Sequence, residues 1–178
     1  MQELDNTHKM SLSIFSAKES LRDAKSRKTG IGLAEFYRAV VSPGQPLTIE
    51  MTKAMFASKD LRAAFQALRA KPSARAVPAL AAASDRKLTQ RMFDGGSISL
   101  VKAARGDQIY VRLQLEPPFS TAALVLLLTN QEAEVIIKRA LPACDTEGEI
   151  LIVLDPTQSD DFALLSALED PRFEGMLL

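Results

Sequence analysis

The sequence predicts an α+β fold, with an N-terminal helical module of three to four short helices followed by an antiparallel β-sandwich or open barrel of about five to six strands. Apolar residues recur at helical spacing in residues 9–70, whereas residues 108–115 alternate between apolar and polar side chains. Strand-length apolar segments then recur at intervals of about 10 to 15 residues with turn residues between them. The absence of long helical patterns between these segments favours antiparallel pairing over parallel β-α-β units.

Length and composition suit one domain, or one domain with a smaller module attached. The chain has 178 residues, of which 47% are hydrophobic and 25% charged, and this balance argues against wholesale disorder. We divide it into a basic helical module at 1–84 and an acidic β-sandwich-like domain at 85–178, with one compact unit as the alternative.

The expected compartment is the cytoplasm. The longest apolar run, residues 122–128, is too short to span a bilayer, and the polar residues at the start of the chain do not resemble a secretory signal. Cys144 is the only cysteine, so no internal disulfide can form. We therefore expect no membrane partner.

The helical half carries clear capping and turn signals. The first helix is predicted at 9–28 and the second at about 32–41, before a turn at 42–46 that contains two prolines. Thr48 and Ser58 are N-cap candidates, so residues 48–70 form either one helix or two. In the first part of this stretch we expect four residues to be buried: Ile49, Met51, Met55 and Phe56.

The β half begins after an Ala-rich stretch, residues 73–84, which Pro78 limits to a turn or an extended crossing. In the polar segment 85–94 the expected apolar anchors are Leu88, Met92 and Phe93. The uninterrupted apolar run at 121–129 predicts a central strand covered on both faces, although its composition also allows a buried helix. The other strands are predicted at 97–103, 108–115, 133–141, 149–154 and 173–178, with a short helix at 162–168.

The net charge of zero conceals a strong asymmetry. Residues 1–106 contain 18 basic and 9 acidic residues, whereas residues 107–178 contain 4 basic and 13 acidic ones. The two halves could dock on each other, the protein could associate head to tail, or the basic half could bind an acidic partner.

Residues that could support catalysis or metal binding are few. His8 is the only histidine and lies near the start of the chain, and acidic neighbours of Cys144 disfavour its thiolate. One histidine and one cysteine do not make a usual zinc site, and no phosphate-binding loop is present. The acidic loops carry the carboxylates that an enzyme or a calcium site would need: Asp145, Glu147, Glu149, Asp155, Asp160 and Asp161. We predict no cofactor and no enzymatic activity.

The leading hypothesis is a non-catalytic cytoplasmic protein-interaction or regulatory protein, whose helical module contacts an unidentified protein partner or which associates with itself. The alternatives are nucleic-acid binding by the basic helices, and a carboxylate-based enzyme or small-ligand binder. The outward face of 108–115 is a second candidate contact, because Arg112 is the only cation between residues 106 and 137. The candidate interaction surface comprises Lys18, Arg22, Lys25, Arg27, Lys28, Arg62, Arg69, Tyr110 and Arg112.

Overall fold

A computed structural model describes residues 30–71, 74–78, 87–104, 106–119 and 122–178. The helices are α2 (Leu33–Val41), α3 (Ile49–Ala57), α4 (Lys59–Arg69) and α5 (Ser159–Glu169). The strands are β1 (Arg75–Val77), β2 (Gln90–Phe93), β3 (Gly96–Lys102), β4 (Ile109–Leu115), β5 (Leu124–Asn130), β6 (Val135–Leu141), β7 (Glu149–Leu154) and β8 (Glu174–Leu177). The helix predicted at 9–28 lies outside the described residues.

Two side-chain caps divide the stretch 48–70 into two helices. The Thr48 hydroxyl accepts a hydrogen bond from the Met51 amide at 3.2 Å, and the Ser58 hydroxyl accepts one from the Leu61 amide at 3.3 Å. The expectation that Ile49 is buried is wrong, because this residue opens α3 and is 70% exposed. None of the helices in the described part of the chain is long and apolar enough to cross a membrane.

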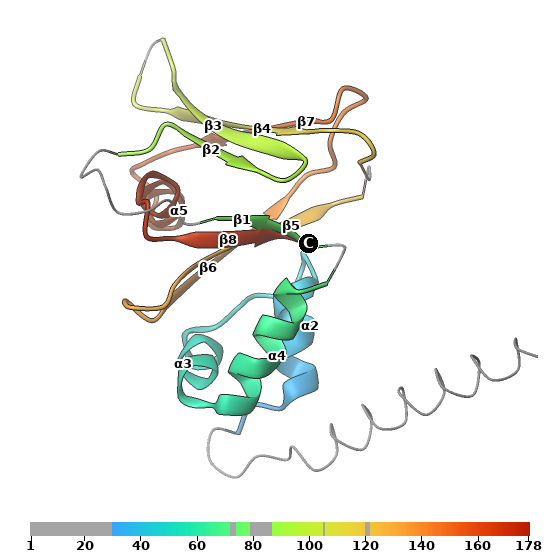
Figure 1. The fold of residues 1–178 in the computed structure, drawn as a ribbon. Helices are drawn as coiled ribbons and strands as arrows, with labels where there is room; N and C mark the ends of the chain where they lie inside the picture. Colours follow the sequence, from blue (N-terminus) through green and yellow to red (C-terminus); the bar gives the residue numbers. More distant parts are fainter. Residues whose placement is uncertain (1–29, 72–73, 79–86, 105, 120–121) are drawn as a thin grey trace, which may run out of the picture.

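The strands form two four-stranded antiparallel sheets. The first, which we call the covered sheet, has the order β1-β8-β5-β6, and the second, the open sheet, has the order β2-β3-β4-β7. Helices α2, α3 and α4 lie on one side of the covered sheet and the open sheet lies on the other (Figure 1). The predicted α+β class, with helices before an antiparallel β region, is confirmed.

There are eight described strands where about six were expected, because two short strands give weak sequence signals. Strand β1 has three residues, too few to show a period of two, and it pairs with β8 within the stretch that was predicted as a turn or extended crossing. Strand β2 is joined to β3 by the turn at Asp94-Gly95, where Gly95 has a φ of +81° that favours glycine.

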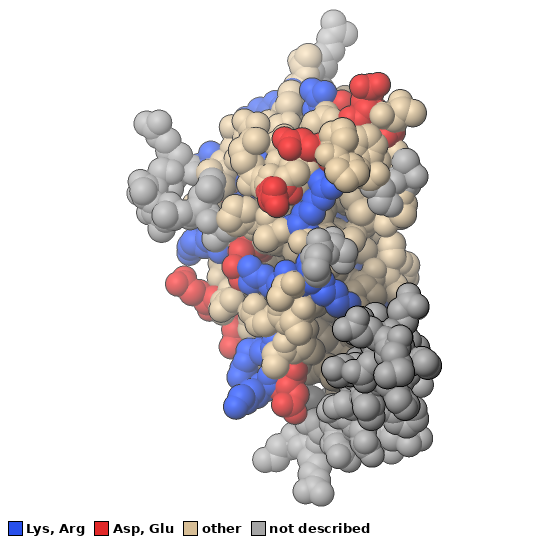
Figure 2. Space-filling model, turned by 45° about the vertical axis from the view of Figure 1, so that its right-hand side comes forward, with Lys and Arg blue, Asp and Glu red and all other residues tan. Residues whose placement is uncertain are grey.

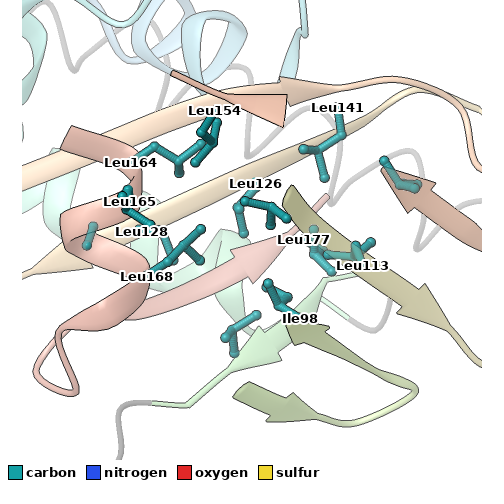
Figure 3. Packing of buried hydrophobic residues seen from close by; sticks show 14 of the residues in the cluster. Ile98, Leu113, Leu126, Leu128, Leu141, Leu154, Leu164, Leu165, Leu168 and Leu177 are labelled. Atoms are coloured by element: carbon teal, nitrogen blue, oxygen red, sulfur yellow. The ribbon is translucent and has the colours of Figure 1, made fainter. Parts of the chain in front are cut away.

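The main core lies between the two sheets and beneath α5. Leu126 and Leu128 of β5 belong to the same cluster as Leu113 of the open sheet, and Leu164 and Leu168 of α5 close it from the side (Figure 3). All five side chains are 3% exposed or less, so this packing excludes water and fixes the separation of the sheets.

A second core joins the three helices to the other face of the covered sheet. Leu127 of β5 is fully buried there against a cluster that includes Phe36 of α2 and Phe65 of α4. The two aromatic rings pack edge to face, with their centroids 6.4 Å apart. Strand β5 is therefore covered on both faces, as its uninterrupted apolar sequence predicted.

Arg91 is a buried cation that docks β2 against the C-terminal end of α5. Its guanidinium donates to the carbonyl oxygens of Leu168 at 2.8 Å and Phe173 at 2.7 Å, and also to those of Ala167 and Asp170. Burial lowers the pKa of Arg91, and the charge of Asp170 opposes that effect. The negative end of the α5 dipole compensates the cation in this position.

The buried Arg91 also explains an error in the predicted anchors of β2. Met92 was expected to point into the core, but it is 59% exposed, whereas Arg91 and Phe93 on either side are buried. Because side chains alternate between the two faces of a strand, Arg91 and Met92 cannot both point inward. Arg91 points inward because the end of α5 and the segment after it offer four carbonyl acceptors.

The charge asymmetry between the two halves is reduced by contacts that cross the boundary at residue 106. Arg69 of α4 forms an ion pair with Glu174 of β8 at 2.5 Å, and Lys87 forms one with Glu169 of α5 at 2.6 Å. Basic and acidic side chains also lie intermingled over the face seen in Figure 2. These contacts agree with the interpretation that the halves are electrostatically complementary.

Candidate interaction surface

The outer face of the open sheet is not covered by any described helix or strand (Figure 1). On β4 the odd-numbered residues are buried against the other sheet, whereas Tyr110, Arg112 and Gln114 point outward. The helices lie beyond the covered sheet, on the opposite side of the molecule (Figure 1). The β4 residues predicted from sequence as a contact surface therefore do lie on an accessible face.

Apolar side chains gather at one end of this face. Val101, Tyr110 and Val153 form a single cross-strand row, because Tyr110 is the register partner of both valines. Leu151 stands beside Arg112 in the next row. Val101 and Leu151 are each 52% exposed and Val153 is 45% exposed, so the row and its neighbour form a continuous apolar area. We call these four residues, together with Arg112 and Glu149, the open sheet face.

A single ion pair borders the apolar row. The Arg112 guanidinium donates to a Glu149 carboxylate oxygen at 2.7 Å, across the β4–β7 pairing. The Arg112 side chain is 53% exposed and the Glu149 side chain 28% exposed. An exposed pair of this kind contributes little to stability. It leaves the open sheet face nearly neutral, with an apolar centre and a polar edge.

The other predicted surface residues are not brought together with Tyr110 and Arg112. Arg69 of α4 donates to both carboxylate oxygens of Glu174, at 2.5 and 2.9 Å, and so holds α4 against β8. Arg62 is exposed on the same helix and donates to the Phe56 carbonyl. The remaining predicted residues lie outside the described residues: Lys18, Arg22, Lys25, Arg27 and Lys28.

Several carboxylates of the acidic loops organise local turns. One Asp145 oxygen accepts the amides of Glu147 and Glu149, at 2.9 and 2.7 Å. Asp155 accepts both the amide and the hydroxyl of Thr157, and these hydrogen bonds lower the pKa of Asp155. Within the described ranges no three His, Cys, Asp or Glu side chains are grouped so that they could hold a metal ion.

The apolar part of the open sheet face was only partly visible in the sequence. Val101 stood out, since it faces away from Ile98 and Leu100 in a predicted strand. Leu151 and Val153 gave a usable signal as well, because they alternate with Ile150 and Ile152. What the sequence could not supply was the strand order that places β7 beside β4.

Comparisons with protein-family models, with curated proteins and with solved structures found no match. The functional argument therefore depends on the geometry of this chain alone.

Proposed function

We propose that the protein is a non-catalytic, cytoplasmic interaction or regulatory protein that binds a protein partner through the open sheet face. The observation that carries the proposal is the exposed row Val101, Tyr110 and Val153 with Leu151 beside it. Contiguous apolar side chains on an otherwise solvated sheet are typical of contact surfaces, and Tyr and Arg are enriched in such surfaces. Cys144 is the only cysteine of the chain, so no internal disulfide can form, and this supports the cytoplasmic assignment.

The nucleic-acid alternative has less support among the described residues. Arg69 is held by Glu174, Arg62 donates to a backbone carbonyl, and Lys71 donates to the Tyr37 hydroxyl at 2.5 Å. Cations that already have internal partners are less available to phosphates. The carboxylate-based alternative is weakened in the same way, because Asp145 and Asp155 organise turns.

Site-specific photo-crosslinking in cells tests the proposal. Tyr110 is replaced by a photoreactive phenylalanine analogue in the full chain, and the matched control carries the same analogue at Ile49, which is 70% exposed on α3. We expect irradiation to yield a discrete adduct of higher mass from position 110 and not from position 49. No adduct at position 110, or equal adducts at both positions, would contradict the proposal.

A further inference from the structure

A groove at the free edge of the covered sheet is a second feature that the proposed function does not use. Strand β6 ends the sheet, and β5 is the only described strand that pairs with it. The groove has a volume of about 520 Å³ and lies between the α2–α3 connection and α5. Its walls and floor are formed by Pro43, Gly44, Gln45, Pro46, Leu47, Ile136, Ile137, Lys138, Arg139, Ala140, Asp160, Ala163 and Leu164.

The hydrogen-bonding pattern of β5 shows which backbone groups of β6 face this groove. Val125 exchanges both backbone hydrogen bonds with Leu178, at 2.9 and 3.0 Å, so the odd-numbered residues of β5 bond toward β8. The even-numbered residues of β5 then bond to β6, at the register partners 135, 137, 139 and 141. The amides and carbonyls of Ile136, Lys138 and Ala140 are therefore directed toward the open edge.

The charges around the groove nearly cancel, because Lys138 and Arg139 of β6 are matched by Asp160 and Asp161 in the first turn of α5. The Lys138 ammonium donates to the Ser42 carbonyl at 2.7 Å and the Gln45 carbonyl at 2.6 Å, and also to that of Ala39, which holds the α2–α3 connection in place. Burial lowers the pKa of Lys138. Arg139 pairs with Asp161 at 3.1 Å. Free backbone groups beside charges that nearly cancel suit an uncharged, extended segment.

The chain itself contains such a segment before α2. Residues 10–17 read Met-Ser-Leu-Ser-Ile-Phe-Ser-Ala, without a charge or a proline. Met10, Leu12 and Ile14 alternate with serines, which is the pattern of a strand that is apolar on one side. The apolar side would meet Pro46, Leu47 and Ile136 in the groove.

The length of the connection allows the segment to reach the groove of its own chain. With residues 17–28 helical and residues 29–30 extended, the connection spans roughly 20 Å, at ~1.5 Å per helical residue. Helix α2 begins close after residue 30 and is about 14 Å long at the same rise, and the α2–α3 connection at its far end lines the groove, so the groove lies within that reach.

We propose that residues 10–16 bind in this groove and add a strand to the free edge of β6, beside Ile136, Lys138 and Ala140. The helix predicted at 9–28 would then begin after this segment. The groove lies on the covered sheet and the open sheet face lies on the other sheet, so this inference does not depend on the proposed function.

Amide hydrogen exchange of the full chain tests the inference. The amides of Ile136, Lys138 and Ala140 are expected to exchange roughly 100-fold more slowly in the wild type than in Leu12→Pro, because proline removes a donor and disrupts the added strand. The amides of residues 137 and 139 bond to β5, so they should stay protected in both proteins and report that the fold is intact.

Leu21→Pro is the matched control, since it interrupts the predicted helix but lies outside the proposed strand. The inference is supported if residues 136, 138 and 140 stay protected in Leu21→Pro and their protection does not depend on protein concentration. Rapid exchange of these amides in the wild type would overturn the inference. A loss of protection in Leu21→Pro equal to that in Leu12→Pro would also overturn it, because it would indicate that a helix occupies the groove. Protection that disappears on dilution would also overturn it, because it indicates a second copy as the occupant.

Discussion

The two sheets of this protein use similar strands in different surroundings. Strand β5 of the covered sheet is buried on both faces and has an uninterrupted apolar sequence, whereas β4 of the open sheet alternates buried and outward-facing residues. A covered strand contributes mainly to the free energy of folding, because each of its side chains is removed from water. An open strand buries only one of its two faces, so fewer of its side chains contribute to the core and its other face stays accessible.

The largest expected effect is a difference in the free energy of unfolding between a substitution in the covered sheet and one in the open sheet. Leu127→Ala should lower the free energy of unfolding by about 2–5 kcal/mol, because the side chain is fully buried between the helices and the covered sheet. Leu151→Ala, on the open sheet face, should change it by less than ~0.5 kcal/mol. Urea unfolding of both variants measures the difference, and equal losses would contradict the assigned burial.

The buried cation gives the next largest effect, at the junction of the open sheet with α5. Arg91→Met should cost about 2–4 kcal/mol, because it leaves four carbonyl oxygens without their donor. Arg172→Met is the control, because Arg172 is exposed and pairs only locally with Asp170. Thermal unfolding that is equal for the two variants would show that Arg91 does not hold α5 in place.

A smaller effect is expected where the helices meet the covered sheet. Arg69→Met removes the two-pronged contact with Glu174 and should cost about 1 kcal/mol, since both side chains are only partly buried. Part of this difference should disappear at high salt, where partly exposed ion pairs are screened. A cost that salt does not alter would point to packing by the arginine stem.

The smallest expected change in stability lies on the open sheet face. Arg112→Glu should alter the free energy of unfolding by less than ~0.5 kcal/mol, because the pair with Glu149 is exposed. It should nevertheless reduce the crosslinked adduct formed at position 110, by placing two like charges beside the apolar row. The charge-swapped double variant Arg112→Glu/Glu149→Arg should recover part of the adduct. Undiminished adduct in Arg112→Glu would remove Arg112 from the interface.

The contrast between the sheets also shows what the sequence could and could not predict. Strand β4 was correctly predicted to be buried on one face and β5 on both, because the sequence pattern of each is long enough to show this. Short elements were missed, as β1 shows, because three residues hold no periodic signal. Arg91 was not predicted to be buried, since its partners are carbonyls about 80 residues away that only the tertiary fold brings close.

The candidate surface was likewise predictable within one strand but not between strands. Tyr110 and Arg112 were identified because one strand suffices to show which side chains point outward. Their neighbours Val101 and Val153 join them through the strand order β3-β4-β7, a property of the sheet and not of any single segment. Arg69 was predicted as part of the interaction surface, but its contact with Glu174 holds α4 against β8.

The most direct test of the central claim combines association and stability in one variant. Val153→Glu is introduced into the full chain that carries the photoreactive residue at position 110, and the adduct yield and the unfolding temperature are measured together. We predict at least a tenfold loss of adduct with a shift in unfolding temperature below ~2 °C, because the residue is 45% exposed beside Tyr110. An undiminished adduct, or a loss of adduct accompanied by a large fall in the unfolding temperature, would contradict the claim.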